Sequence, residues 1–207
     1  MLPENVKIVI PARRGSKGFP FKNRKLLQYT LDSIPKRYKD RVWITTDDEE
    51  IIDKCKHEYN VFNRPPCLAK DDTPIWNVIY HLILSERAFK KNDIVIMLYL
   101  TYPDRTWKTI SNAFSFFKKT KAKSLLCKIK PESHPYLMMY ERGKKGQPII
   151  PHNKFRRQDY PDVFELSHCV CIFKMSEFRK LNKNMLNNDT IYFPIEKHRD
   201  IDYKNQF

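Results

Sequence analysis

The chain has 207 residues, of which 41% are hydrophobic and 13% aromatic. That length and composition allow one domain with a substantial core and exclude general disorder, and no apolar run approaches the roughly 20 residues that a membrane-spanning helix requires. The formal net charge of +15 favours a polyanionic partner, which could be nucleic acid, a membrane surface or a small phosphorylated ligand.

The N-terminus and the cysteines both indicate an intracellular protein. The apolar stretch before Arg13 is too short for the core of a signal peptide and lacks a small-residue cleavage site. The five cysteines include no CxxC pair, which fits reduced, mostly buried thiols better than disulfides or a zinc site. We therefore predict a cytoplasmic protein with no membrane partner.

Strands and helices alternate along the first 130 residues. The apolar run at 6–11 predicts a strand buried on both faces, as in a parallel sheet, and the segments 41–48, 93–101 and 122–130 predict three further strands. Helical spacing is found at 27–34, 48–59, 73–89 and 106–119. Thr73 is the expected N-cap of the third helix, with Pro74 at its first position. The alternation predicts an α/β fold with a doubly wound, mostly parallel, Rossmann-like sheet.

The alternation stops after residue 130. Residues 131–166 contain several prolines and a glycine-centred turn between two short apolar runs, which predicts an irregular arm with a hairpin. A strand at 164–174, a short helix near 175–181 and a strand near 190–195 then complete the sheet. No linker interrupts the chain, so residues 1–207 are expected to form a single domain from which the 131–166 arm extends.

The loop after the first predicted strand reads PARRGSKGFPFKN and starts at the carboxyl edge of the sheet, where open α/β folds bind their ligands. Gly15 and Gly18 would let backbone N–H groups approach an anion. Fixed positive charge comes from Arg13, Arg14, Lys17 and Lys22. The spacing matches neither the Walker pattern nor the dinucleotide-binding glycine pattern. The loop is interpreted as a phosphate cradle, with an ordinary basic surface loop as the alternative.

This loop resembles the signature loop of the sugar-nucleotide cytidylyltransferases, in particular their acylneuraminate branch. Other segments are similar to motifs of the same family and occur in the same order, namely ITTDDEEI, FNRPPCLAKDDTP, LTYPDRT, ESHP, RRQDYPDVF and RDIDYKNQF. The resemblance runs from about residue 6 to the C-terminus. It implies a nucleotide-diphospho-sugar transferase fold and an enzyme that joins CTP to a sugar acid and releases pyrophosphate.

The resemblance implies that the nucleotide binds at the glycine loop and the segments near it. Arg13 and Lys17 would hold the triphosphate as catalytic residues, and Lys22 and Asn23 would help to orient it. The remaining substrate-binding positions would be Arg14, Gly15, Ser16 and Gly18 of the loop, Arg64 at the nucleotide edge of the cleft, and Asp72 and Thr73 near ribose or base.

Asp200 and Asp202 stand two residues apart, a spacing that puts both side chains on one face of an extended segment. The residues alone are equally consistent with a solvated acidic pair near the chain end. The family resemblance favours a shared Mg²⁺ that also binds the phosphates, with Asp202 among the catalytic residues.

Arg157 and Gln158 match the arm motif that reaches the sugar acid in the family, commonly across a homodimer interface. A guanidinium suits a carboxylate because it can bind it with two parallel hydrogen bonds. The alternative is that both are surface residues of a basic arm. The resemblance therefore implies a homodimer formed through residues 131–166.

The sequence departs from the family at two places that are associated with recognition of base or sugar. Tyr99 stands where glutamine is usual, and Ser167 and His168 stand where Asn-Gly is usual. His168 could be a general base, but a lone histidine beside an apolar strand is more often structural. The acceptor therefore stays open among acylneuraminate, a related nonulosonic acid and another sugar such as 3-deoxy-octulosonic acid.

A different class of function is also considered, in which the chain is a catalytically silent relative with a basic nucleic-acid-binding surface. No recognisable nucleic-acid motif supports it, and the two late aspartates would have no role. Nucleic acid is therefore not the expected partner.

Overall fold

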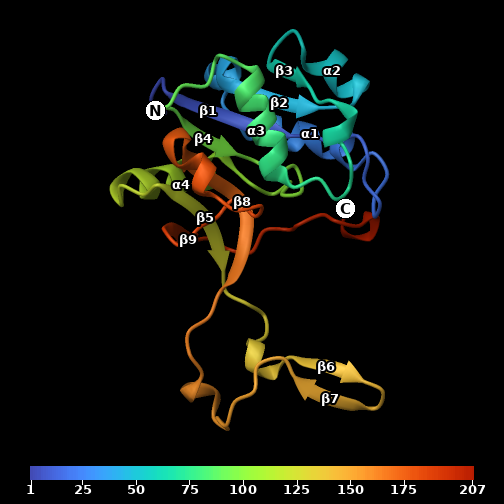
Figure 1. Ribbon diagram of the computed structural model, residues 1–207, viewed down its shortest axis with the longest axis vertical. Coiled ribbons are helices and arrows are strands. Elements are labelled where there is room, and N and C mark those ends of the chain that lie inside the picture. Colours follow the sequence, from blue (N-terminus) through green and yellow to red (C-terminus); the bar gives the residue numbers. More distant parts are fainter.

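The computed structural model describes all 207 residues and contains a seven-stranded sheet in the order β3-β2-β1-β4-β8-β5-β9 (Figure 1). These strands are β1 (Val6–Pro11), β2 (Val42–Thr46), β3 (Asn60–Asn63), β4 (Ile94–Met97), β5 (Ser124–Ile129), β8 (Glu165–Lys174) and β9 (Thr190–Pro194). Strand β8 runs antiparallel to β4 and β5, and every other pairing in the sheet is parallel. The predicted mostly parallel α/β sheet is confirmed.

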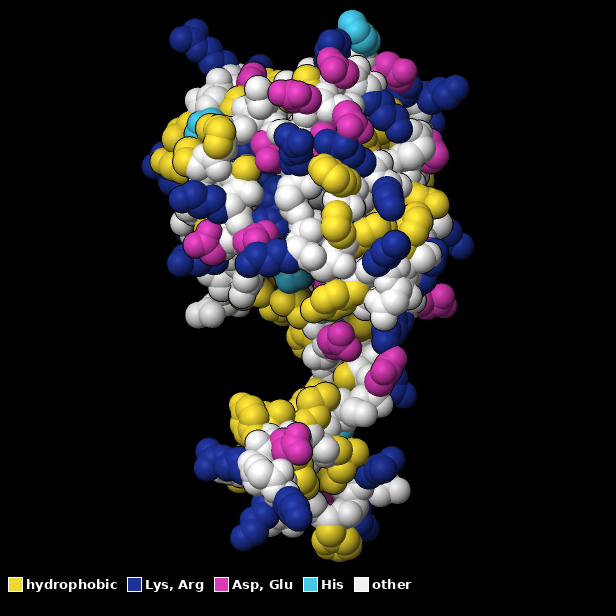
Figure 2. Space-filling view, turned by 90° about the vertical axis from the view of Figure 1, so that its right-hand side faces the viewer, with side chains coloured by type: hydrophobic (Ala, Val, Ile, Leu, Met, Phe, Trp, Pro, Cys, Tyr) yellow, Lys and Arg dark blue, Asp and Glu magenta, His cyan; other side chains and the backbone are white.

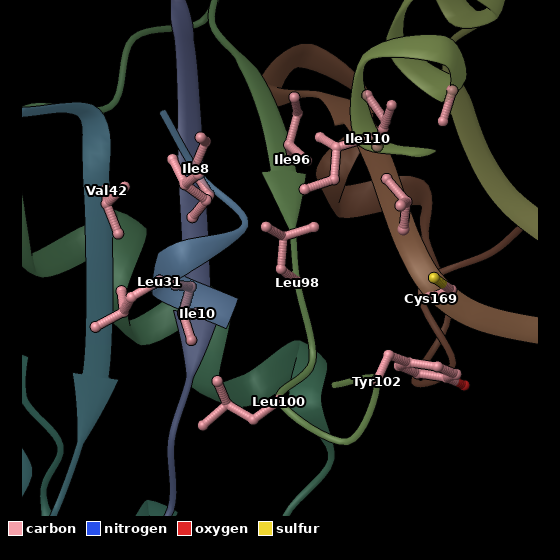
Figure 3. Close-up of a cluster of buried hydrophobic side chains, with 14 of the residues drawn as sticks. Ile8, Ile10, Leu31, Val42, Ile96, Leu98, Leu100, Tyr102, Ile110 and Cys169 are labelled. Carbon is pink, nitrogen blue, oxygen red and sulfur yellow. The ribbon is translucent and has the colours of Figure 1, made fainter. Parts of the chain in front are cut away.

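Four α-helices pack on the sheet: α1 (Lys22–Asp32), α2 (Glu49–Cys55), α3 (Ile75–Ser85) and α4 (Trp107–Lys119). Successive residues of β1 face opposite sides, because side chains alternate along a strand. Ile8 and Ile10 belong to the larger core cluster with α1, α2 and α4, whereas Val9 belongs to the smaller cluster with α3. Figure 3 shows part of the larger cluster. Two buried faces explain why β1 reads as one continuous apolar run.

The structure corrects three details of the predicted elements. Helix α1 begins at Lys22, five residues before the predicted 27, after Phe21 in a left-handed conformation with φ 54°. Thr73 is not the N-cap of α3, because the helix begins at Ile75 with Pro74 in the capping position and no side-chain cap. The helix expected near 175–181 is a 3-10 turn over Met175–Lys180.

Strand β3 was not predicted, because Asn60 and Asn63 are polar and the strand pairs with β2 only, at the edge of the sheet. None of the helices in the protein combines the length and the apolar character needed to cross a membrane.

Residues 131–164 leave the sheet as an arm (Figure 1) that carries the antiparallel hairpin β6 (Met139–Arg142) and β7 (Lys145–Pro148). Gly143 at the hairpin turn has φ +61°, a conformation that glycine adopts without strain. The rings of Tyr136, His152 and Tyr160 pack together, with centroids 4.2 to 5.5 Å apart. The last two residues of the predicted arm, 165 and 166, belong to β8 instead.

Candidate active site

Two cavities lie at the edge of the sheet where the parallel strands end. The first, of about 260 Å³, is lined by the loop after β1, the segment after β3 and the residues that follow β4. The second, of about 390 Å³, is lined by residues after β4, β5 and β9 and by the start of β8. Lys22 lines the first cavity and Asp202 lines the second, and the Lys22 Nζ lies 3.0 Å from the Asp202 Oδ1. This ion pair joins the two cavities.

Most of the predicted nucleotide-binding residues line the first cavity, namely Arg13, Gly15, Ser16, Lys22, Asn23, Arg64 and Thr73. The glycine loop thus lies opposite the segment that follows β3, as the resemblance implied. Four predicted residues do not line this cavity: Arg14, Lys17, Gly18 and Asp72. Arg14 has an exposed side chain, and its backbone N–H donates to the Asp47 Oδ1 at 2.8 Å.

Asp71 forms ion pairs with Arg13 and Lys17, the two residues that would bind the triphosphate according to the family resemblance. The Arg13 Nη1 lies 2.6 Å from the Asp71 Oδ1, and the Lys17 Nζ lies 3.1 Å from the Asp71 Oδ2. The hydrogen bond from Lys17 and the charge of Arg13 lower the pKa of the Asp71 carboxyl. Asp71 lines the cavity whereas Asp72 does not. The sequence signal for Asp71 was its position in the LAKD segment, directly after Lys70.

Arg64 brings a buried positive charge to the first cavity without a carboxylate partner. The residue is 4% exposed, and its Nη2 donates to the backbone oxygen of Thr45 at 2.9 Å. Burial lowers the pKa of the Arg64 guanidinium to about 10, and the nearby charge of Asp47 opposes this shift. A buried cation without a counterion is unfavourable by itself, so the site is electrostatically prepared for an anion.

The second cavity contains both late aspartates. Ile201 between them is fully buried, whereas Asp200 and Asp202 are exposed, so the two carboxylates lie on the same side of an extended segment, as their spacing predicted. Burial, and then the hydrogen bond to Asp200, raise the pKa of the Tyr102 hydroxyl. Arg199 donates to Asp104 through two nitrogens, at 2.8 and 2.7 Å.

The two aspartates fit Mg²⁺ in the chemistry of their oxygen atoms and in lining one cavity. No group of three or more histidine, cysteine or acidic side chains could hold a metal ion. Mg²⁺ is usually held by one or two carboxylates and completed by phosphates and water, so two carboxylates are a sufficient protein contribution. Lys22 donates a hydrogen bond to one oxygen of Asp202, which limits how that carboxylate could bind a metal ion.

A family model described as cytidylyltransferase matches residues 7–135 of the chain. The chain belongs to the cytidylyltransferase family. It is similar to the N-acylneuraminate cytidylyltransferases of Streptococcus agalactiae serotypes III and Ia, with 22% identity over 213 residues. The alignments cover 96% of this chain and 51% of those relatives, so the chain spans about half of their length.

The fold of this cytidylyltransferase is similar to solved structures. One is a CMP:2-keto-3-deoxy-manno-octonic acid synthetase complexed with CTP, with a TM-score of 0.66 and 13% identity over 97% of this chain and 94% of that chain. Another is a 4-diphosphocytidyl-2C-methyl-D-erythritol synthase from Anaerococcus prevotii, with a TM-score of 0.61, 13% identity and the same coverage. At this identity the likeness establishes the nucleotidyltransferase fold.

The two departures from the cytidylyltransferase pattern lie against each other. The rings of Tyr99 and His168 meet edge to face, with centroids 5.6 Å apart and an interplanar angle of 81°. Tyr99 lines the first cavity. The His168 Nε2 lies 3.3 Å from the backbone oxygen of Asn184, which satisfies one ring nitrogen within the protein. This supports the structural interpretation of His168 over a general base.

Arg105 is a buried residue of this cytidylyltransferase to which the sequence analysis gave no role. It is 2% exposed, and its guanidinium donates to the backbone oxygens of Tyr99 and Cys169 at 2.9 and 2.8 Å and to the Thr30 Oγ1 at 2.9 Å. It therefore ties the loop after β4, which lines both cavities, to α1 and β8. The only sequence signal was a charged residue within the LTYPDRT segment.

The structure gives a packing reason for Gly18. A Cβ atom there would lie 2.8 Å from the Tyr203 Cδ1 and 2.9 Å from the backbone oxygen of Asp202, whereas a Cβ at Gly15 would meet nothing within 4 Å. The packing of the C-terminal residues therefore requires glycine at position 18.

Arg157 and Gln158 lie in the exposed part of the arm, outside both cavities of this chain. A single chain therefore does not bring them to the site.

Proposed function

We propose that this protein transfers CMP from CTP to a hydroxyl group of a sugar acid, an acylneuraminate or a related nonulosonic acid, and releases pyrophosphate. The observation that carries the proposal is the ion pair between Lys22 and Asp202, whose Nζ and Oδ1 atoms lie 3.0 Å apart. Lys22 lines the first cavity with other cations, and Asp202 lines the second with Asp200. In the reaction the acceptor oxygen forms a bond to the α-phosphorus, the bond to the pyrophosphate oxygen breaks, and the hydroxyl proton is released.

The first cavity is suited to the triphosphate. Its charged lining consists of four cations and one carboxylate: Arg13, Lys22, Arg64, Lys70 and Asp71. A triphosphate that enters would replace Asp71 as the partner of Arg13 and Lys17. Cations fixed before the reaction stabilise charge that develops on the phosphate oxygens without having to reorganise.

We place Lys22 next to the bond between the α-phosphorus and the pyrophosphate oxygen, which breaks in the reaction. It is 8% exposed and lies between the two cavities, so its charge is little screened by solvent. Asp200 and Asp202 would hold Mg²⁺, which would supply further positive charge to the phosphate oxygens. Asn23 fixes the loop by donating from its Nδ2 to the backbone oxygen of Arg13 at 2.7 Å.

The acceptor would occupy the second cavity, whose own cations are already engaged. Arg199 is paired with Asp104 and Lys197 with Glu132. The carboxylate of a sugar acid therefore needs a cation from elsewhere, and we propose that Arg157 on the arm of a second chain supplies it. The same observation favours the alternative of a sugar acceptor without a carboxylate, because such an acceptor would need no further cation.

A homodimer through the arm belongs to this proposal. The exposed apolar side chains of the arm support it: Leu137, Met138, Met139, Tyr140, Ile149, Ile150 and Phe155. Exposed apolar groups in such number are typical of interaction surfaces, and Figure 2 shows hydrophobic side chains gathered on the arm. A cytoplasmic location, where CTP is available, is part of the same proposal.

The test is to incubate the purified protein with each of the four nucleoside triphosphates, Mg²⁺ and a panel of nonulosonic acids, 3-deoxy-octulosonic acid and uncharged sugars, and to measure pyrophosphate. Release is expected with CTP and a nonulosonic acid only. Release with 3-deoxy-octulosonic acid or with an uncharged sugar would support an alternative acceptor. No release with any pair, together with salt-sensitive binding of nucleic acid, would contradict the enzymatic proposal.

A further inference from the structure

The last six residues lie across the glycine loop and the start of α1. Their first residue, Asp202, pairs with Lys22 at 3.0 Å. Their last residue, Phe207, packs its ring on Phe19 at 5.6 Å and on Tyr29 at 6.2 Å between centroids. Figure 1 shows the C-terminus beside the loop that follows β1. We call residues 202–207 the C-terminal strap.

Hydrogen bonds within the strap connect its residues to one another. The Gln206 Oε1 accepts hydrogen bonds from the backbone N–H groups of Asp202 and Tyr203, at 2.7 and 2.8 Å. The Gln206 N–H in turn donates to the backbone oxygen of Tyr203 at 3.1 Å. These bonds close one 3-10 turn over Lys204–Gln206. A displacement of the ring of Phe207 or Tyr203 would therefore be transmitted to Asp202.

The strap meets the loop at the one glycine that is sterically required. The position of a Gly18 Cβ lies 2.8 Å from the Tyr203 ring and 2.9 Å from the Asp202 backbone oxygen. The contact thus reaches the residue whose carboxylate pairs with Lys22. On the other side of Asp202, Ile201 is fully buried and its N–H donates to the backbone oxygen of Thr101 at 2.8 Å. Asp202 is therefore held from both sides along the chain.

We propose that Tyr203, Gln206 and Phe207 are positioning residues that seat the strap on Gly18 and Phe19 and thereby hold the Asp202 carboxylate at Lys22, between the two cavities. In this arrangement the glycine loop and Asp202 hold each other in position, although more than 180 residues separate Gly18 from Asp202. The consequence for metal binding and turnover rests on the proposed function. The seating itself does not.

The first experiment compares two glycines of the same loop. Gly18→Ala is expected to push the strap away and expose Lys22, whereas Gly15→Ala adds the same methyl group where nothing lies within 4 Å. The measurement is the rate at which acetic anhydride labels the Lys22 amine, read by mass spectrometry, with thermal melting as the check of folding. Labelling is expected to rise several-fold in Gly18→Ala and to stay at the wild-type rate in Gly15→Ala.

A second pair of variants keeps the inference testable if Gly18→Ala folds poorly. Phe207→Ala and Tyr203→Ala remove the rings that seat the strap, and Phe207→Tyr and Tyr203→Phe retain them. The alanine variants are expected to raise Lys22 labelling and to weaken Mn²⁺ binding by roughly 10–100-fold, the usual effect of removing a group that orients a metal ligand. The conservative variants are expected to restore both. Thermal melting of each variant separates the loss of seating from global destabilisation, because only a fall in the melting temperature marks the latter.

Unchanged Lys22 labelling in folded Gly18→Ala and in both alanine variants would overturn the inference, as would equal labelling in Gly15→Ala and Gly18→Ala. Raised labelling with unchanged Mn²⁺ binding would support the seating and contradict the metal role that the proposed function gives to Asp202. The labelling depends on neither CTP nor acceptor. A protein that releases no pyrophosphate would therefore contradict the proposed function and leave this inference to be decided by the labelling.

Discussion

At the scale of single residues, Asp71 forms ion pairs with two cations of the glycine loop. Both of its oxygens are engaged, one by Arg13 and the other by Lys17. Because Lys17 and Arg13 lower the pKa of this carboxyl below its ordinary value of 3.8, the ion pairs persist at neutral pH. Their contribution to stability is present above the unfolded pKa and is lost only as pH falls through the lower folded pKa.

Asp71→Asn is expected to strengthen binding of pyrophosphate roughly fivefold, because the anion no longer competes with an internal carboxylate for two partly exposed cations. The melting temperature at pH 7 should change little, since the pairs are exposed to solvent. Isothermal titration with pyrophosphate provides the measurement. Weaker binding in the variant would show that Asp71 orients Arg13 and Lys17 for the anion and does not compete with it.

Arg13 and Arg14 are adjacent and chemically identical, yet the structure gives them different surroundings. Arg13 lines the first cavity, and Arg14 directs its side chain to solvent. Arg13→Ala should lower kcat/KM by roughly 100-fold and change the free energy of unfolding by less than about 1 kcal/mol. Arg14→Ala should stay close to wild type in both. Steady-state kinetics and urea unfolding on the same preparations check this, and equal losses for the two variants would contradict the assignment.

At the scale of elements, the arm gathers several exposed large apolar side chains in one segment. The four residues of β6 are all exposed, although the strand includes Met139 and Tyr140. A two-stranded hairpin alone is marginally stable in water, so a partner surface would explain why this hairpin keeps apolar residues outward.

Met139→Asp is expected to shift the protein from dimer to monomer in light scattering, because a charge would replace an apolar group in the proposed interface. Met139 is 60% exposed, and Leu84 on α3 is 59% exposed, so Leu84→Asp is the matched control and should leave the mass unchanged. Leu84→Asp should leave thermal melting unaffected, whereas Met139→Asp should lower the melting temperature, because association stabilises the folded chain and the variant loses it. A wild-type chain that is monomeric at all concentrations would refute the dimer through the arm.

At the scale of the whole molecule, the positively charged side chains are spread over the surface. Figure 2 shows Lys and Arg side chains scattered over the visible face of both the sheet region and the arm, so the net charge of +15 defines no single nucleic-acid surface on that face. A dispersed charge of this sign still raises the local concentration of anionic ligands. This fits a small polyanion better than a long one.

Four of the five cysteines are buried and only Cys67 is exposed. Burial raises the pKa of the Cys127 thiol to about 12 and that of Cys169 to about 11, and it also raises those of Cys55 and Cys171. One thiol per chain should therefore react rapidly with Ellman's reagent at pH 8, and all five in denaturant. Cys67→Ser should abolish the rapid reaction. More than one rapidly reacting thiol in the native protein would show that the sheet opens.

The sequence by itself determined the sheet and the place of the glycine loop. Runs such as 6–11 are apolar apart from Lys7, a pattern typical of a strand buried on both faces, so the alternation of strands and helices could be predicted from local signals. The loop after such a strand must emerge at the carboxyl edge of a parallel sheet. The pair Asp200 and Asp202 shared a face for the same kind of local reason, the period of two in an extended chain.

Only the tertiary structure decided which side chains meet. Asp71 forms ion pairs with cations almost 60 residues away, and Arg105 donates to backbone oxygens on separate elements. Gly18 lies so close to Tyr203 that no larger residue fits there. Such contacts join residues far apart in the chain, and composition and periodicity describe only a window of a few turns or strands. Partners across a cavity depend on how whole elements pack. For that reason the sequence could indicate an anion-binding loop but could not show that Asp202 lies against Lys22 at its edge.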